Sequence, residues 1–401
     1  MKLKTIGFIG LGLIGGSIAR RIKQVHPDTI IMAYMRTRST LEEAKADGIV
    51  DIILDGVDET LRTCDMIILC TPVSFNESYL KAIRPFIKPG CIVTDVGSTK
   101  TAIHETVIAL DMEDCFVGGH PMAGSERTGY ACSKASLLEN AYYVITPTSK
   151  TTKDQLDTMI QFAADQSAIP LVLDYKNHDY AVAAISHVPH VIASSLVNLV
   201  AQSDFPDGTM KKIAAGGFKD ITRIASSSPV MWEQILFTNK DNIISLLEDY
   251  KKAIDQTITD LKTDNHKDIY DIFEQSGTYR SSISDKRGSA TMNPEYAIFC
   301  DIPDQPGAIS VIATLLAFEN VSIKNIGINH NREHMAGTIK IEFHDHASCE
   351  RATECLEYHH YPVYQKNKYI INIFRKDFYE DSNCGWCRRR CDSSSPYQKI
   401  R

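Results

Sequence analysis

The chain has 401 residues, of which 43% are hydrophobic and 23% are charged, and its formal net charge is −7. This composition is that of an ordinary globular protein and excludes a wholly disordered chain. The acidic balance argues against a nucleic-acid partner, because nucleic-acid-binding proteins usually carry a basic patch or a basic excess.

The sequence also bears on location. No window approaches the roughly 20 apolar residues that a membrane span needs, so no membrane association is expected. The start, Met1-Lys2-Leu3-Lys4, leads directly into a strand pattern and lacks the cleavage site of a signal peptide. The cysteines number 11, and those in the first 355 residues are scattered without the spacing of a disulfide framework. We therefore expect a cytoplasmic protein with reduced thiols.

Residues 1–175 alternate short apolar runs with amphipathic helical patterns such as Ser17–Val25 and Ser39–Ala46. Most of the runs are apolar on both faces, as in strands that helices cover on each side. The expected strands are Thr5–Ile9, Ile30–Met35, Met66–Cys70, Cys91–Val96, Phe116–Gly119, Tyr143–Thr146 and Leu171–Asp174. This alternation predicts an α/β domain of the Rossmann type, with a largely parallel, doubly wound sheet.

Residues 176–290 show helical patterns and no convincing strand, which predicts an all-helical second domain. The expected helices are Asp179–Ala201, Val230–Phe237 and Asn242–Thr263. The stretch Ala183–Val200 is almost entirely apolar or small, so it should be buried in a core or at a subunit interface. A Ser-, Lys- and Gly-rich linker is expected at Ser281–Thr291.

A third domain is expected over residues 292–375. Its elements should be a strand at Tyr296–Ile302, a helix at Pro306–Glu319, strands at Val321–Ile328 and Gly337–Phe343, a helix at Ala347–Tyr358 and a strand at Tyr361–Gln365. The order βαββαβ is that of a small ferredoxin-like domain. Residues 376–401 should be a mobile tail, in which Cys384, Cys387 and Cys391 lack a fourth ligand and suggest no metal site.

A glycine-rich loop follows the first expected strand and opens a helix, with the sequence Gly10-Leu11-Gly12-Leu13-Ile14-Gly15. In this context the first glycine permits a tight turn, the second a close approach of a pyrophosphate, and the third close packing of helix and strand. The helix N-terminus then attracts the anion. The sequence therefore predicts a dinucleotide site, although a glycine-rich turn without a ligand would have the same pattern.

The residues after the second expected strand bear on the choice between NAD and NADP. NAD sites usually have a carboxylate there for the ribose hydroxyls. Here Met35 takes that place and is followed by Arg36, Thr37 and Arg38. Arginine pairs with a 2′-phosphate, so NADP is favoured over NAD, unless Arg36 and Arg38 only begin a solvated helix.

Three segments carry more polar residues than a scaffold needs. The first holds Asp95, Ser98 and Lys100 after one expected strand, and the second holds His120 and Glu126 just past another. Ligands bind outside the carboxyl ends of parallel strands. The third segment is helical and contains His178, Asp179, Ser186, His187 and His190, with Asp220 and Arg223 further on. His187 and His190 are three residues apart and should share a helical face.

These motifs together make the resemblance specific. Gly-x-Gly-x-x-Gly-Gly-Ser, Thr71-Pro72-Val73, Asp-x-Gly-Ser-x-Lys, Gly-His-Pro-Met-Ala-Gly, Ser-His-x-Pro-His and Phe-Lys-Asp-x-Thr-Arg-Ile-Ala occur in the order seen in the prephenate dehydrogenase family. The resemblance covers about residues 1–290. The C-terminal module resembles an ACT domain, a type that often binds amino acids, with its turn at residues 301–307.

The resemblance implies NAD(P)-dependent oxidative decarboxylation of prephenate to 4-hydroxyphenylpyruvate in tyrosine biosynthesis. His120 would accept the proton of the ring hydroxyl, Ser98 would hydrogen-bond the same hydroxyl, and Arg223 would clamp a carboxylate of the dianionic substrate. The other implied substrate-site residues are His187, His190, Ser186, Glu126, Asp179 and Asp220, and Thr71 and Pro72 would line the cofactor groove.

Several alternatives stay open at this point. His187 and His190 could be metal ligands or core histidines, Arg223 could form only a local ion pair with Asp220, and Lys100 could bind a ligand or face solvent. Arogenate dehydrogenase has the same fold and chemistry on the amino analogue. A non-catalytic amino-acid sensor is a further possibility, against which the intact glycines and histidines argue.

A regulatory ligand and an oligomeric state are expected as well. The ACT resemblance implies that L-tyrosine acts as an effector at Asp304, Pro306, Gly307 and Ala308. The apolar stretch Ala183–Val200 suggests a homodimer, because it needs a partner surface if the helical domain is small.

Overall fold

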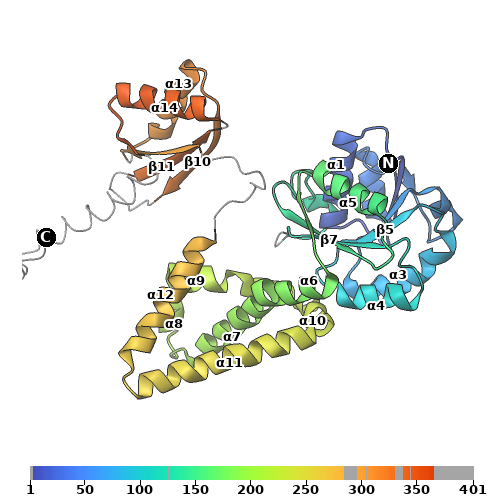
Figure 1. Ribbon diagram of the computed structural model, residues 1–401, viewed down its shortest axis with the longest axis horizontal. Helices are drawn as coiled ribbons and strands as arrows, with labels where there is room; N and C mark the ends of the chain where they lie inside the picture. Colours follow the sequence, from blue (N-terminus) through green and yellow to red (C-terminus); the bar gives the residue numbers. More distant parts are fainter. Residues whose placement is uncertain are drawn as a thin grey trace, which may run out of the picture. The chain divides into compact units, whose positions relative to one another are not determined.

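The computed structural model describes residues 3–124, 127–283, 296–303, 305–329, 337–343 and 345–364. The chain divides into two compact units, Met1–Ala290 and Thr291–Arg401 (Figure 1). The sheet and the long helices that follow it thus belong to one unit. The expected tail over residues 376–401, and with it Cys384, Cys387 and Cys391, lies outside the described residues.

The first unit begins with a five-stranded parallel sheet in the order β3-β2-β1-β4-β5. Its strands are β1 (Thr5–Ile9), β2 (Ile30–Tyr34), β3 (Ile52–Ile53), β4 (Met66–Leu69) and β5 (Ile92–Asp95), and β3 was not expected. Every residue of β1, β4 and β5 is buried, because helices cover the sheet on both faces. These helices are α1 (Leu13–Val25), α2 (Arg38–Ala46), α3 (Asn76–Ile83), α4 (Thr101–Ala109) and α5 (Lys153–Asp165).

A second, three-stranded sheet continues from β5 through a parallel bridge between Val93 and Phe116. It contains β6 (Val117–Pro121), β7 (Tyr142–Pro147) and β8 (Ile169–Val172), and β6 runs antiparallel to β7. Two strand boundaries expected from the sequence are therefore wrong. The strand expected at Phe116–Gly119 extends through Pro121, and the one expected at Leu171–Asp174 ends at Val172, because Asp174 caps the next helix with its side chain.

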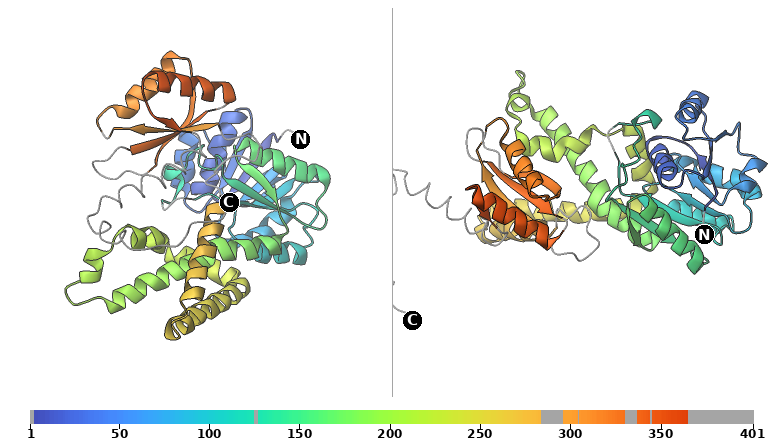
Figure 2. Two further views of the ribbon diagram at one scale, coloured as in Figure 1. Left: turned by 60° about the vertical axis from the view of Figure 1, so that its left-hand side comes forward. Right: turned by 90° about the horizontal axis from the view of Figure 1, so that it is seen from above.

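The rest of the first unit is helical and forms a lobe beside the sheets (Figure 2). Its long elements are α6 (Tyr175–Val182), a π-helical segment (Ala183–His187), α7 (Val188–Ser203), α10 (Pro229–Thr238), α11 (Lys240–Lys262) and α12 (His266–Ser282). The short ones are α8 (Thr209–Ile213), α9 (Gly216–Thr222) and a 3-10 turn at Arg223–Ser226. Helix α12 was not expected, and it includes Ser281 and Ser282, which the sequence pattern had assigned to a linker.

The helix Tyr175–Ser203 is long and apolar enough, by length and composition alone, to cross a membrane. The expectation that no window approaches such a span is wrong on this measure. The helix nevertheless carries His178, Asp179 and His187 fully buried, each with a polar partner within the described residues. Such an arrangement is typical of a helix that packs on a protein core.

The second unit has the element order βαββαβ. Its elements are β9 (Ala297–Ile302), α13 (Ala308–Phe318), β10 (Ile323–Asn329), β11 (Gly337–Phe343), α14 (His346–Tyr358) and β12 (Val363–Tyr364). The strands form an antiparallel sheet in the order β10-β11-β9-β12, with its own core. Helix α13 begins later than the expected Pro306, because Gly307 has a left-handed φ of 87° and acts as its N-cap. Asp304 lies outside the described residues.

Candidate active site

The glycine-rich loop has the geometry that a dinucleotide requires. Gly10 has φ +89°, and a Cβ there would lie 2.7 Å from the carbonyl oxygen of Cys70. A Cβ at Gly15 would lie 3.0 Å from the Cys70 Sγ, so α1 packs closely on the end of β4. A Cβ at Gly12, in contrast, would meet no atom within 4 Å. The space beside Gly12 is therefore open, as a pyrophosphate would need.

The N-terminus of α1 is prepared for an anion. Gly12 is its N-cap, no side chain caps it, and its first turn, which begins at Leu13 and Ile14, has no acidic residue. The unpaired N–H groups and the helix dipole therefore favour a negatively charged group. Leu11 is buried in the core, and Thr71 and Pro72 follow β4 beside the loop, with the Thr71 methyl 3.2 Å from the position of a Cβ on Gly10. The residues of this edge fit a bound dinucleotide.

The two arginines after β2 make different contacts. Thr37 is the N-cap of α2, and Arg38 forms ion pairs with Glu42 and Asp55 on the surface. The exposed Arg36 guanidinium lies over the Phe75 ring, 5.2 Å from its centroid. Two carboxylates thus already neutralise Arg38, which leaves Arg36 as the stronger candidate for contact with a 2′-phosphate.

The half-buried His120 lies at one end of a hydrogen-bonded relay whose other two members, His178 and Asp179, are buried. Its Nδ1 is 2.8 Å from the Nε2 of His178, and the His178 Nδ1 is 2.8 Å from an oxygen of Asp179. His178 and Asp179 are 1% and 0% exposed. His120 is part of β6 itself rather than of a loop past a strand, as the sequence had suggested, and its backbone is paired with Val144 of β7. A strand position makes the ring's orientation more rigid than a loop would.

Asp179 joins α6 to the loop that carries Ser98. Its two carboxylate oxygens accept the backbone N–H groups of Lys100, at 2.7 Å, and of Thr101, at 2.8 Å. Hydrogen bonds from these groups and from His178 lower the pKa of Asp179 despite its burial, so the carboxylate is ionised.

The pKa of His120 is well below its ordinary value of 6.5. Burial is the main cause, since it disfavours the charged imidazolium, and the nearby His178, Lys100 and His187 act in the same direction. His120 is therefore a neutral imidazole at neutral pH, as a general base must be.

A second buried network fixes the distance between the strand-end loop and β6. Asp95, the last residue of β5, accepts hydrogen bonds from the backbone N–H groups of Gly97, at 2.9 Å, and Gly119, at 3.2 Å. It also pairs with the ammonium of Lys100, which is 0% exposed, so Lys100 does not face solvent. A Cβ at Gly119 would lie 2.7 Å from the carbonyl oxygen of Asp95, so glycine allows β5 and β6 to approach here.

The histidines of the second helical segment gather around Trp232 of α10. His190 stacks on the indole with ring centroids 3.7 Å apart, and His187 contacts its edge at 5.9 Å. Asn239 donates to the His187 Nδ1 at 3.2 Å and to the Asp179 carbonyl oxygen at 2.7 Å. The His190 Nδ1 donates to the carbonyl oxygen of Ser186 at 2.8 Å. Burial lowers the pKa of His187 to about 4 and also lowers that of His190, so both rings are neutral.

The remaining predicted residues have different positions. Arg223 is exposed at the start of the turn that packs on α7, close enough to His190 to depress that ring's pKa. Ser98 is half-buried in the loop after β5. Asp220 is exposed on α9, and no hydrogen bond or ion pair joins it to the described histidines of the site, so its predicted role finds no contact. Glu126 lies outside the described residues.

From the sequence, His178 was noted beside Asp179 without a role, and Trp232 and Asn239 were not predicted. His178 is next to Asp179 in the sequence, and an adjacent acid and imidazole in a helix could have indicated a relay. Trp232 and Asn239 are brought to the site from α10 and its end, and no local pattern indicates their contacts. Within the described residues no group of three or more His, Cys, Asp or Glu side chains could hold a metal ion.

Comparisons with known proteins agree with this geometry. The nucleotide-binding domain of prephenate dehydrogenase matches residues 18–169, and the dimerization domain of prephenate dehydrogenase matches residues 174–275. The prephenate dehydrogenase of Bacillus subtilis is 36% identical over 88% of this chain and 95% of its own length.

Two solved structures are similar to the chain. The prephenate dehydrogenase of Aquifex aeolicus in complex with hydroxyphenyl propionate and NAD+ is 27% identical, with a TM-score of 0.67 over 71% of this chain and 99% of that one. The arogenate dehydrogenase of Synechocystis is 30% identical, with a TM-score of 0.64 over 70% of this chain and 100% of that one. The sequence matches, the nucleotide-binding loop and the buried histidine relay together show that the chain belongs to the prephenate dehydrogenase family of NAD-binding oxidoreductases.

Proposed function

We propose that this chain catalyses the NAD(P)-dependent oxidative decarboxylation of prephenate to 4-hydroxyphenylpyruvate. The observation that carries the proposal is the relay from Asp179 through His178 to His120, beside a loop that fits a dinucleotide. This reaction needs a base for the ring hydroxyl and an acceptor for the hydride from the same carbon. The relay supplies the base.

The relay determines which nitrogen of His120 acts. A carboxylate can only accept, so the His178 Nδ1 carries a proton toward Asp179. When each ring carries one proton, the His178 Nε2 then accepts from the His120 Nδ1. The Nε2 of His120 therefore has a free lone pair, and this nitrogen takes the hydroxyl proton of the substrate. The same logic orients the imidazole of a catalytic triad.

The rest of the chemistry follows from this proton transfer. Bound NAD(P)+ supplies the hydride acceptor. Ser98, in the loop that Asp179 holds, would hydrogen-bond the substrate hydroxyl and keep it in line with His120. Once the ring carbon is oxidised, loss of CO₂ produces an aromatic ring, so the site needs no dedicated acid for that step.

Prephenate has two carboxylates, and a site that desolvates them must supply donors. Arg223 is the proposed clamp for one carboxylate, with His190 beside it. The Trp232 Nε1 is a buried donor with no hydrogen-bond partner in the described part of the chain. An unsatisfied buried N–H costs free energy, which a substrate carboxylate would recover. We place Trp232, His187, His190 and Ser186 in the substrate wall, with Asp179 as the orienting group.

Turnover tests the proposal directly. The purified protein, mixed with prephenate and NAD+ or NADP+, should raise the absorbance at 340 nm and release 4-hydroxyphenylpyruvate. Arogenate is the second candidate substrate, since the Synechocystis structure of similar fold is an arogenate dehydrogenase. A higher kcat/KM for arogenate would reassign the substrate, and no turnover of either would contradict catalysis and favour an amino-acid sensor.

The pKa of His120 predicts the pH profile. Its base function is lost when the ring gains a proton, so activity should fall as the pH falls through the pKa of His120. Because that pKa is well below 6.5, the acidic limb of kcat/KM for prephenate should lie clearly below pH 6.5. Steady-state rates from pH 4.5 to 8, with protein stability checked at each pH, measure it. A limb at or above pH 6.5 would contradict a buried, neutral base.

Arg36 predicts the cofactor preference. We propose that NADP is used better than NAD, because the Arg36 guanidinium is positioned to pair with a 2′-phosphate. Arg36→Gln should then raise KM for NADP about tenfold, the size of one lost charge-assisted hydrogen bond, and leave KM for NAD nearly unchanged. The matched control is Arg38→Gln, whose guanidinium is already paired with Asp55 and Glu42. Equal catalytic efficiency of the wild type with both cofactors would remove the preference.

The fold of the second unit suggests that it regulates the activity of the enzyme. We propose that it is an ACT-like domain that binds L-tyrosine at the turn that contains Pro306, Gly307 and Ala308, and that binding lowers activity. The βαββαβ order and the left-handed Gly307 at the start of α13 support this. Removal of residues 292–401 should abolish inhibition by tyrosine while turnover of prephenate persists. Unchanged sensitivity would place the inhibitor at the active site.

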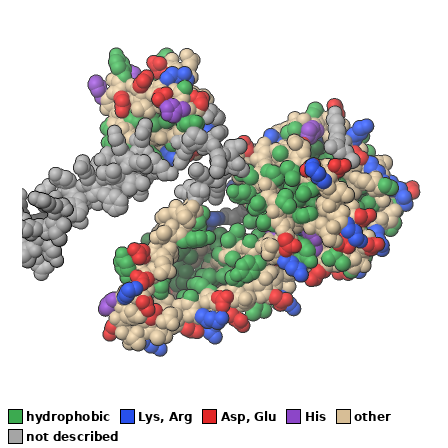
Figure 3. Space-filling view, viewed as in Figure 1, with side chains coloured by type: hydrophobic (Ala, Val, Ile, Leu, Met, Phe, Trp, Pro, Cys, Tyr) green, Lys and Arg blue, Asp and Glu red, His purple; other side chains and the backbone are tan. Residues whose placement is uncertain are grey.

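The helical lobe supports a homodimer. Large apolar side chains are exposed along it, including Ile185, Leu199, Phe237, Leu261 and Phe273, each at least 60% accessible. Figure 3 shows hydrophobic side chains gathered in a hollow over these helices. So large an apolar surface is typical of a subunit interface, and the family model names this region the dimerization domain.

A further inference from the structure

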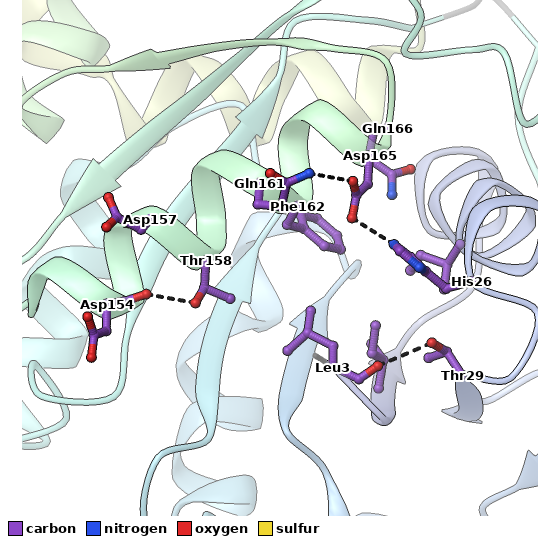
Figure 4. Close-up of a pocket in the computed structure, with 12 residues that line it drawn as sticks. Leu3, His26, Thr29, Asp154, Asp157, Thr158, Gln161, Phe162, Asp165 and Gln166 are labelled. Atoms are coloured by element: carbon purple, nitrogen blue, oxygen red, sulfur yellow. Dashed lines mark hydrogen bonds and ion pairs between the residues drawn. The ribbon is translucent and has the colours of Figure 1, made fainter. Parts of the chain in front are cut away.

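A cavity of about 650 Å³ lies between α1 and α5, apart from the residues assigned to the cofactor and the substrate. Figure 4 shows α5 along one side, with Thr158, Phe162 and Asp165 facing Leu3, Thr29 and His26 on the other. The complete lining is Leu3, Ile6, Ile22, His26, Thr29, Asp154, Asp157, Thr158, Gln161, Phe162, Asp165 and Gln166. This volume is in the range of sites for small molecules.

An unsatisfied amide points to a ligand here. Gln166 is 1% exposed, and neither its amide oxygen nor its amide nitrogen has a hydrogen-bond partner among the described residues. Buried polar groups are normally paired, because an unpaired one carries a desolvation cost. A group that enters this cavity and bonds to the amide would remove that cost.

The charge of the lining selects the kind of ligand. It includes three aspartates, and none of the described residues that line the cavity is a lysine or an arginine. An anion such as prephenate or a nucleotide is therefore repelled. No group of three His, Cys, Asp or Glu side chains in the described part of the chain could hold a metal ion. Among charged ligands, an organic cation therefore fits this lining.

The spacing of the polar groups selects its shape. Asp154, Asp157, Gln161 and Asp165 are three or four residues apart on α5, so each lies about one turn, or about 5.4 Å, from the next. Within the described residues the Asp154 carboxylate has no hydrogen-bond or ion-pair partner, and Asp157 has only the surface pair with Lys153, which is worth little. Asp165 bonds to His26 at 2.8 Å and to Gln161 at 2.7 Å.

The opposite wall includes the apolar side chains of Leu3, Ile6 and Ile22 beside His26 and Thr29. A chain of methylene groups with an ammonium at every helical turn matches both walls. We propose that this cavity binds a linear aliphatic polyamine, with its ammonium groups on the α5 carboxylates, its methylenes on the apolar wall and one N–H group on the Gln166 amide oxygen.

Isothermal titration calorimetry with spermidine, at about 0.1 M salt to screen diffuse attraction, tests the proposal. We expect one spermidine per chain. Gln166→Leu and the double variant Asp154→Asn/Asp157→Asn should each weaken binding about tenfold or more. The matched control, Asp249→Asn/Asp255→Asn on α11, removes the same charge elsewhere and should bind like the wild type.

Thermal denaturation separates a lost ligand contact from a damaged fold. Without spermidine, Gln166→Leu should melt at or above the wild-type temperature, because it removes an unpartnered buried amide. Spermidine should raise the melting temperature of the wild type and not that of Gln166→Leu. Absence of binding, equal weakening in the α11 control, or the same stabilisation by MgCl₂ at equal ionic strength would overturn the proposal and leave a water-filled cavity.

Discussion

Replacement of His120 by asparagine should lower kcat for prephenate by about 10²–10⁴-fold, the usual contribution of a positioned general base. This corresponds to about 3–5 kcal/mol of lost transition-state stabilisation. Asparagine removes the nitrogen that accepts the hydroxyl proton and keeps an N–H group that can donate to His178. The fold and the affinity for the cofactor should therefore change little.

Steady-state kinetics and cofactor titration of His120→Asn measure these two effects separately. The matched control is His346→Asn on α14, an exposed histidine of the second unit that pairs with Glu350 and should leave kcat unchanged. A kcat within a few-fold of wild type for His120→Asn would show that another group accepts the proton.

Asp179→Asn should have an effect of similar size through a different cause. The carboxylate holds the proton of His178 on Nδ1, which leaves the reactive Nε2 of His120 unprotonated. An amide can present its NH₂ group to His178 instead, and that reverses the hydrogen-bond direction along both rings. We therefore expect kcat to fall by about 10²–10⁴-fold, as when the orienting carboxylate of a catalytic triad is replaced.

The same substitution should also cost stability. Asp179 accepts the backbone N–H groups of Lys100 and Thr101, and an amide cannot satisfy both of them and His178. Leaving one buried donor unpaired costs about 1–3 kcal/mol. Urea unfolding measures this loss, and Asp249→Asn, an exposed carboxylate on α11, is the control. Normal turnover by a folded Asp179→Asn protein would contradict the orienting role.

A purely structural role for Asp179 would predict something else. A loosened fold should raise KM and lower stability without changing the shape of the pH profile. Loss of the correct tautomer should lower kcat at every pH and move the acidic limb, because the rings then exchange protons differently. The pH profile of Asp179→Asn therefore separates the two roles.

Local patterns were enough to predict the glycine-rich turn after β1 and most of the strands and helices. Close contacts with Cys70 require glycine at positions 10 and 15, and Gly10 also has a positive φ. Because glycine alone meets such requirements, they can be recognised in the sequence. Strands β1, β2, β4 and β5 of the parallel sheet are mostly apolar on both faces, and their positions were predicted to within one residue at each end, whereas the two-residue β3 was missed.

Features that depend on contacts between distant residues were not predictable in this way. His120 and His178 are 58 residues apart, and only the packing of α6 on β6 and β7 makes them a relay. β6 pairs antiparallel with β7, and this pairing places His120 inside a strand. The sequence of residues 116–121 alone does not indicate it. The burial of Lys100 likewise depends on its pairing with Asp95, since a lone lysine usually faces solvent.

Two features of the helical lobe were also not predicted from the sequence. Helix α12 combines exposed apolar residues such as Tyr270 and Phe273 with charged ones, so its hydrophobic periodicity is weak. It contacts α11, but none of its residues is buried in this chain. The π-helical segment that turns His187 toward Trp232 is equally invisible in the spacing of His187 and His190.

The central claim is that the Nε2 of His120 takes the proton from the substrate hydroxyl. A crystal structure of the ternary complex with NAD(P)+ and 3-(4-hydroxyphenyl)propionate tests it most directly. The phenolic oxygen of this ligand takes the place of the substrate hydroxyl. We predict the oxygen within about 3.2 Å of the His120 Nε2, with Nδ1 still bound to His178. An imidazole turned away from the ligand, or a ligand whose oxygen contacts a different base, would contradict the account.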